Sequence, residues 1–419
     1  MHRLQVEQRA YFRALLANTF RKVIRLSQWC CTAPYPLQPY QHKTAQNQPN
    51  RFRLVQALRR VLSAVLFSIM LSVPFLLYFL FRANVHTFTI PLSIKLMFYL
   101  QALLQTGSLG YVLLVYQFRT SYHRFYFERL VSVLVEFGRP EVDKRLQQLE
   151  RNIARLMLVI LLLAILVLSA LLLGDHSWGN LLKAMIFITT QLMATSFALQ
   201  YVMLFGIVAV LLGQMNDTLK ALLEHGVGYS GETESGGYRS HQPLAPVRLT
   251  RDDEDTIEKI RLLQLHLLQI VLRTNGGEYG RLLIVVLLTT FIFLNTDLLQ
   301  LYQGIKAGVL TFDVIGAKLT NSALKFALLV MFAFSNRLIQ QQNLRGLKLV
   351  YQLHSSANSL RCHEITNRFV TQTTLFLGKA HEAYSMISID MTLIMSVVGG
   401  LTSILVVLVQ FSDAKTTCN

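Results

Sequence analysis

The residues with the spacing best suited to chemistry lie in one apolar segment near the end of the chain, residues 389–411. Steps of four, three, four and three residues separate five small or polar positions there: Ser396, Gly400, Ser403, Val407 and Gln410. Such steps place side chains on one face of a helix. A small and polar face either allows two helices to pack closely or lines an ion pathway, and the pattern alone leaves both open.

Other polar or aromatic residues interrupt apolar segments two to six in the halves that we place toward the outer face of the membrane. They are Tyr99, Gln101, Gln191, Thr195, Asn295 and Gln300. A small organic ligand needs apolar walls with a few placed polar groups, so these residues are candidates for a binding pocket. Hydrogen bonds between neighbouring helices use the same residue types, which is the plainer interpretation of any one of them.

Lys325 is a charged residue within an apolar run. A buried ammonium in a bilayer is costly and is usually paired or functional. Asp297 lies at a comparable depth in the preceding apolar run and is the candidate partner. The alternative is that the lysine stem extends along the helix and brings its charge to the outer surface.

Motifs of enzymes and of metal sites are missing. The chain has no phosphate-binding lysine loop and no G-x-G-x-x-G fingerprint. His363-Glu364 and His381-Glu382 both lack the second histidine of a zinc-binding helix. We therefore expect no enzymatic activity, no metal and no cofactor.

The elements that must position these residues are membrane-spanning helices. Of 419 residues, 53% are hydrophobic and only 15% are charged, against about 25% charged in an ordinary soluble domain. Seven apolar runs each approach the roughly 20 residues that cross a bilayer. They cover residues 61–81, 92–118, 156–173, 185–212, 282–302, 319–334 and 389–411. The sequence predicts an all-α polytopic membrane protein with seven transmembrane helices.

Lys and Arg residues gather on one side of these predicted spans. With the N-terminus placed inside, the inner segments carry 33 of the 40 and the outer segments carry 5, while Lys95 and Lys325 lie within spans. Cytoplasmic flanks of spans are enriched in these residues. We therefore expect an inside N-terminus and an outside C-terminus, opposite to a G-protein-coupled receptor. The net charge of +17 then reflects topology, and no nucleic-acid partner is expected.

The spans divide the chain into five predicted parts. They are a cytoplasmic N-terminal segment (1–60), helices one to six with their loops (61–336), a cytoplasmic helical anchor segment (337–388), the seventh helix (389–411) and an extracellular tail (412–419). Helical patterns at 256–272 and 337–353 continue into spans five and six and predict a cytosolic helical hub, with a break at Gly276-Gly277. A Gly- and Ser-rich insert, 226–246, is expected to be mobile.

An amphipathic helix is predicted near the N-terminus. The apolar residues Phe12, Leu15, Leu16, Phe20, Val23 and Ile24 recur at helical spacing among basic residues. Such a helix lies on the inner leaflet or packs on the protein's own cytoplasmic helices. The pattern fits both.

Two stretches of the chain carry a family signature. In the last span, Asp390 precedes Ser403, Ile404, five hydrophobic residues, Gln410 and Phe411. This resembles insect gustatory receptors, in which an aspartate precedes Thr-Tyr, five hydrophobic residues and Gln-Phe. Ser403 is a mild change, and Ile404 departs from the family's tyrosine, whose role is therefore not carried over. The second stretch is similar to the family's approach to span five: Leu265-His266, Asn275, Tyr279-Gly280, Leu282 and Leu283.

The resemblance implies a homo- or heterotetrameric, ligand-gated, non-selective cation channel in the plasma membrane of taste neurons. It implies that the last span lines the pore and that small tastants bind between the outer halves of the other spans. Phe411 would then close the narrow outer mouth, and Gln410 would offer carbonyl oxygens to passing monovalent cations. Sugar-sensing members often carry an acidic residue where this chain has Leu405. We therefore expect bitter compounds, such as alkaloids like caffeine, rather than sugars.

Two other function classes fit a polytopic membrane protein. A transporter of small organic solutes often shows internal repeats and unwound, charged spans, and no repeat is visible here. A metabotropic receptor is disfavoured by the predicted orientation. Currents recorded with G-protein signalling blocked would separate the three classes.

Overall fold

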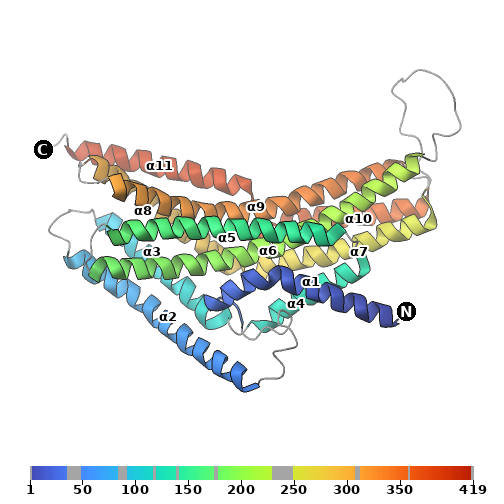
Figure 1. Ribbon diagram of the computed structural model, residues 1–419. Coiled ribbons are helices and arrows are strands. Elements are labelled where there is room, and N and C mark those ends of the chain that lie inside the picture. The colour runs from blue at the N-terminus through green and yellow to red at the C-terminus, as the bar shows by residue number, and fades with distance from the viewer. Residues whose placement is uncertain are drawn as a thin grey trace.

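The computed structural model describes residues 2–34, 49–83, 92–116, 119–137, 141–173, 178–228, 249–306, 312–356 and 359–416, which are almost entirely helical (Figure 1). In chain order the helices are α1 (His2–Trp29), α2 (Pro49–Ala83), α3 (Leu92–Val115), α4 (Thr120–Phe137), α5 (Glu141–Leu173), α6 (Trp178–Gly228), α7 (Arg251–Arg273), the π-helix η4 (Thr274–Glu278), α8 (Gly280–Lys306), α9 (Phe312–Ser356), α10 (Leu360–Lys379) and α11 (Met391–Thr416). The Gly- and Ser-rich insert predicted at 226–246 lies almost wholly outside the described residues.

Each of the seven predicted spans falls on one long helix: α2, α3, α5, α6, α8, α9 and α11. Within the described residues, five helices are long and apolar enough to cross a membrane, in α2, α5, α6, α8 and α9, and α11 holds a shorter apolar stretch, Met391–Ile404. Helix α2 begins twelve residues before the predicted span, at Pro49. The additional turns are rich in Arg, a good helix former, so hydropathy marks the span but not the helix.

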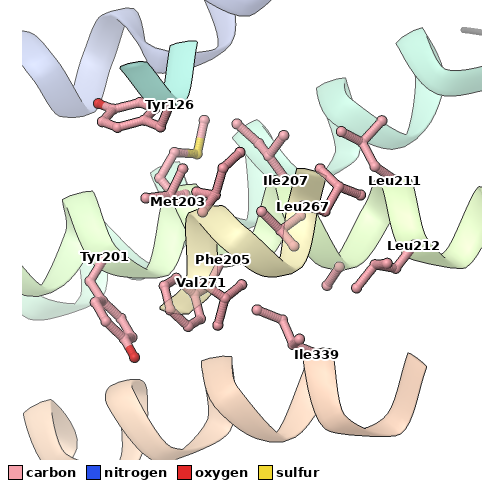
Figure 2. Close-up of a cluster of buried hydrophobic side chains, with 14 of the residues drawn as sticks. Tyr126, Tyr201, Met203, Phe205, Ile207, Leu211, Leu212, Leu267, Val271 and Ile339 are labelled. Atoms are coloured by element: carbon pink, nitrogen blue, oxygen red, sulfur yellow. The ribbon is translucent and has the colours of Figure 1, made fainter. Parts of the chain in front are cut away.

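The core is built around α6, a helix of 51 residues that packs on α9 and α5. Phe205, Ile207 and Leu212 of α6 meet Leu267 of α7 and Ile339 of α9 (Figure 2). All five side chains are buried. Helix α6 shows little amphipathicity along its length, as expected for a helix that is surrounded by other helices.

Helices α1, α4, α7 and α10 gather at one end of the molecule with the C-terminal parts of α6 and α9 (Figure 1). We call α1, α4, α7 and α10 the base. In α1, Leu16, Phe20, Val23 and Ile24 are at most 3% exposed, in contact with α4, α5 and α6. The apolar face of α1 therefore packs on the protein itself, and the interpretation that placed it on the inner leaflet is wrong.

The continuation of span six into the base is confirmed, because α9 runs for 45 residues without interruption to Ser356. The continuation of 256–272 into span five needs correction. Helix α7 ends at Arg273, and the π turn η4 stands between it and α8, with Tyr279 N donating to Thr274 O at 3.0 Å. The break predicted at Gly276-Gly277 falls within this turn.

A small antiparallel hairpin precedes α11. Its strands, β1 (Glu382–Ala383) and β2 (Ile387–Ser388), pair in the register Glu382 with Ser388 and Ala383 with Ile387. The predicted helical anchor segment 337–388 thus ends in a hairpin. Strands of two residues carry no periodic signal, which is why the sequence pattern did not indicate them.

Candidate functional site

Helix α11 begins with an aspartate cap. Asp390 Oδ1 accepts from the backbone N of Thr392 at 3.0 Å and of Leu393 at 3.2 Å. A carboxylate at this position satisfies free backbone donors and the positive end of the helix dipole. The aspartate of the family signature therefore fixes where the last helix starts.

One half of α11 has no partner within the described part of the chain. Ile394 and Leu401 are 8% exposed and face α8 and α9, whereas Met395 is 75% and Val407 is 47% exposed. Ser396, Ser403 and Gln410 are exposed as well. The structure therefore leaves four residues of the predicted stripe on the open half.

Gly400 is the exception in that stripe. It is half-buried, and a Cβ added there would lie 3.3 Å from the Phe291 ring of α8. Glycine lets α11 approach α8 closely, so this position joins the two helices. The side chain of Phe411 lies outside the described residues.

A small cavity lies between α3, α6, α8 and α9, away from the base. Its described lining residues are Leu109, Ala194, Val286, Thr289, Thr290, Phe293, Lys325 and Leu328. The centres of water-sized molecules have about 30 Å³ of room in it, which suffices for about two waters. The cavity thus lies between four of the helices, spans two, four, five and six, among which a pocket was expected.

The ammonium of Lys325 belongs to this cavity. Lys325 is 6% exposed, and its Nζ lies 5.3 Å from the centroid of the Phe293 ring. Asp297, predicted as its partner, lies close enough to attract it electrostatically but accepts a hydrogen bond from Ser322 Oγ at 3.1 Å. Among the described residues, no carboxylate oxygen lies within 4.0 Å of Lys325 Nζ.

The six predicted ligand-binding residues do not appear among the described lining residues. Asn295 is buried but donates to Phe291 O of its own helix at 2.9 Å, and Gln191 donates to Thr195 Oγ1 at 3.4 Å. Tyr99 is half-buried. The side chains of Gln101 and Gln300 lie outside the described residues. Gln191 lies one turn before the lining residue Ala194, and its Oε1 is buried without a hydrogen-bond partner.

The polar and aromatic lining residues that sequence reasoning missed are Thr289, Thr290 and Phe293 on α8. A pair of threonines within an apolar span was visible in the sequence. Their orientation was not, because nearly every neighbouring position in this helix is apolar and the pattern does not show which face is buried against α9.

A second buried polar site lies where the base meets the spans. Asn336 Nδ2 donates to Tyr201 Oη at 2.6 Å, Tyr201 Oη donates to Asn275 Oδ1 at 2.7 Å, and Asn275 Nδ2 donates to Asn336 Oδ1 at 3.0 Å. These three side chains, which we call the junction ring, are at most 1% exposed. The ring closes on itself and joins α6, η4 and α9.

The junction ring also holds the chain that leads into α11. Asn275 Nδ2 donates to Ala380 O at 2.7 Å, and Tyr384 N donates to Asn275 O at 2.9 Å. The hairpin turn at Tyr384 and Ser385 has φ of 49° and 56°, values that are uncommon without glycine. Arg281 supports the turn by donating to Tyr384 Oη at 3.0 Å.

Two further residues of the second signature stretch have a clear part at this junction. Tyr279 Oη donates to Gln200 Oε1 at 3.1 Å. A Cβ added to Gly280 would lie 1.8 Å from Asn275 O and 2.9 Å from Tyr384 N, so only glycine fits there. The stretch thus places the π turn, the hairpin and α8 in contact.

Comparisons with known proteins agree with this architecture. A family model described as 7tm chemosensory receptor matches residues 20–415. Among solved structures, the chain is similar to the insect olfactory receptor OR5 from Machilis hrabei in complex with eugenol, with a TM-score of 0.57 and 12% identity over 94% of this chain and 97% of that chain. No curated protein sequence matches the chain. At such low identity, the likeness to the solved structure shows the fold alone.

Proposed function

The chain belongs to the 7tm chemosensory receptor family, and from that premise we propose that it is a subunit of a ligand-gated, non-selective cation channel that detects small tastants. Four copies, identical or with other gustatory receptor subunits, would surround one pore in the plasma membrane of gustatory receptor neurons. Membership of a receptor family, together with several apolar helices, gives no support to an enzymatic role.

The observation that carries the proposal is the open half of α11. Ser396, Ser403 and Gln410 are exposed on a helix whose other half is packed on α8 and α9. Ser403 Oγ donates to Gly399 O of its own helix at 2.9 Å, but a glutamine amide that faces lipid would be costly, because hydrocarbon offers it no partner. Around a four-fold axis the same groups would line a water-filled pathway. No carboxylate lies on this stripe, so we expect weak selectivity among monovalent cations.

Helix α8 connects the proposed ligand site with the proposed pore. Val286, Thr289 and Phe293 of α8 line the cavity, and Phe291 on the same helix contacts Gly400 of α11. A ligand that moves α8 by a fraction of an ångström therefore acts directly on α11. The junction ring fixes the other end of both helices, so that displacement is confined to the cavity end.

The proposed stimulus is a bitter compound rather than a sugar. The support is Leu405, which stands where sugar-sensing relatives often carry an acid. Alkaloids such as caffeine are the first compounds to test, and the decisive readout is a dose-dependent current in cells that express the chain.

Currents with G-protein signalling blocked test the channel itself. Gln410→Ala should alter the permeability ratios of monovalent cations, and Phe411→Ala should raise the current without ligand. Met395→Ala, on the open half but off the stripe, serves as the matched control for surface expression. If both variants reach the surface with wild-type leak and wild-type selectivity, α11 is not the gate.

The proposed orientation has its own test. We expect the N-terminus to be cytoplasmic and the C-terminus extracellular, from the distribution of Lys and Arg. Epitope tags at each end, stained on intact and on permeabilised cells, check this. Staining of an N-terminal tag on intact cells would show that the N-terminus is extracellular and would contradict the proposed topology.

A further inference from the structure

Lys325 is a buried cation with unused hydrogen-bonding capacity. Its ammonium carries three donors, and its described surroundings offer the face of Phe293 and the more distant attraction of Asp297. No hydrogen bond from Lys325 to a described residue is formed. A buried ammonium without acceptors carries a large desolvation penalty, so the site favours any group that supplies acceptors.

Asp297 does not neutralise this charge by itself. It attracts both Lys318 and Lys325, and it accepts a hydrogen bond from Ser322. One carboxylate between two ammonium groups leaves this cluster with a formal charge of +1. The excess positive charge faces the cavity through Lys325, because Lys325 is the member of the cluster that lines it among the described residues.

The walls of the cavity select the rest of a ligand. Leu109, Val286 and Leu328 are apolar, and the described lining includes no acidic residue. Thr289 Oγ1 donates to Val285 O and Val286 O of its own helix, at 2.9 Å and 3.0 Å, and keeps its lone pairs free to accept. The open room of about 30 Å³ matches the two oxygens of one carboxylate, and the apolar body of a ligand requires the walls to part.

We infer, resting on the proposed function for the role of the cavity as ligand site, that it recognises small organic acids: a carboxylate pairs with Lys325 Nζ while an apolar body packs on α3 and α8. Organic cations are rejected, because the cavity offers them a like charge and no described carboxylate. Caffeine, which is uncharged and carries carbonyl acceptors, is compatible with such a site, whereas a protonated alkaloid is not.

Thiol chemistry tests the charge of the cavity without knowledge of the natural ligand. In the purified full-length chain, Thr289→Cys places a thiol on the cavity wall. We would measure its rates of reaction with the sulfonatoethyl and aminoethyl methanethiosulfonates, which are similar in size and opposite in charge. The same measurement on the native chain gives the background of its four cysteines, which are Cys30, Cys31 and Cys362, all buried, and Cys418.

The ratio of the anionic to the cationic rate should fall at least about tenfold when Lys325→Met is added, because a unit charge a few ångströms away dominates the local potential. Lys325→Arg should keep the ratio. Lys318→Met removes the same charge outside the described lining, and as the matched control it should change the ratio by less than about threefold.

A second measurement tests the ligand class. Benzoate, benzamide and benzylamine share one ring and differ in the polar group. Benzoate should slow modification of the introduced thiol by the uncharged methyl methanethiosulfonate at least about tenfold more than benzylamine at equal concentration. Lys325→Met should remove that difference.

Three results would overturn the inference: an unchanged rate ratio in Lys325→Met, equal protection by benzylamine and benzoate, or a thiol that no reagent reaches. None of these measurements needs a current. A chain that prefers anions here but carries no ligand-gated current keeps this inference and loses the proposed function. A chain that conducts in response to tastants but shows no charge preference does the reverse.

Discussion

Two buried polar regions of the molecule differ in whether their polar groups have hydrogen-bond partners. At the junction ring, Tyr201, Asn275 and Asn336 satisfy one another at 2.6–3.0 Å. At the cavity, the Lys325 ammonium has an aromatic face and a more distant carboxylate. Helix α9 carries a residue of each region: Asn336 follows Lys325 by eleven residues, about 17 Å along the helix.

The difference distinguishes a site that fixes the positions of the helices from a site that can bind a ligand. A closed ring of hydrogen bonds gains little free energy over water but makes any other arrangement costly, because each broken bond leaves a buried group unpaired. An unpaired charge does the opposite: it lowers stability and leaves binding energy available. We expect mutations at the junction to unfold the protein and mutations at the cavity to change what it binds.

The largest effect is expected from Gly280→Ala. The new methyl group would lie 1.8 Å from Asn275 O and 2.9 Å from Tyr384 N, and backbone on both sides prevents its accommodation. We expect loss of the folded chain, measured as surface expression and as monodisperse protein after purification. Gly277→Ala is the matched control, because a Cβ added there would meet no described residue within 4 Å beyond its chain neighbours and its own helix. Wild-type yield of Gly280→Ala would mean that the junction is loosely packed.

Asn275→Ala is expected to follow. It leaves the Tyr201 hydroxyl without its acceptor, and Asn336 Oδ1 and Ala380 O without the donor Asn275 Nδ2, at a cost of about 2–4 kcal/mol in the free energy of unfolding. Thermal unfolding of the purified chain measures this. Asn295→Ala is the control: Asn295 is also buried, and among the described residues its side chain bonds only to a carbonyl of its own helix. Equal losses for the two asparagines would remove the distinction between a ring and a local bond.

His123, in the base, sharpens the comparison through pH. It is 1% exposed, its Nδ1 lies 2.7 Å from Tyr126 Oη, and its Nε2 is buried without a hydrogen-bond partner. Burial lowers the pKa of His123 to about 3. Because the unfolded chain, with a pKa near 6.5, takes up the proton first, stability is lost as pH falls below that value.

At pH 5.5 this loss amounts to about 1.4 kcal/mol, and at pH 7.5 it is about zero. His123→Gln should remove that part of the pH dependence, measured as the difference between unfolding free energies at the two pH values. This difference between the two pH values is not affected by any destabilisation that glutamine causes equally at both pH values. An unchanged difference would mean that His123 is hydrated or paired in the folded chain.

Much of the fold follows from the sequence, since each predicted span falls on one long helix and the apolar face of α1 was visible in its spacing. The family signature also marked Asn275, Tyr279 and Gly280. What it could not show is why these residues matter. The ring needs Tyr201 and Asn336, and the second close approach at Gly280 needs Tyr384, all more than 60 residues away in the sequence.

The ligand site was predictable only in part. Lys325 stands out because a charge within an apolar run is rare. The polar candidates were chosen by residue type, and two of them, Gln191 and Asn295, donate within their own helices. In a span that is apolar on every side, periodicity does not identify the inward face, so Thr289 and Phe293 could not be found from spacing.

The smallest effect on stability, and the one that decides the comparison, is expected from Lys325→Met. Methionine keeps the unbranched stem and removes the charge. The variant loses the weak attraction to Asp297, but it no longer has to bury an ammonium away from water. The free energy of unfolding should change by no more than about 1 kcal/mol, and a gain is equally consistent with replacing a buried charge by an apolar side chain. Thermal unfolding of this variant beside Asn275→Ala shows the contrast directly.

A loss as large as that of Asn275→Ala would mean that Lys325 is fully paired, and a cycle with Lys325→Ala and Asp297→Ala would then show a coupling energy above about 2 kcal/mol. Additive effects in that cycle, with stability kept, leave the ammonium as a group held ready for a ligand.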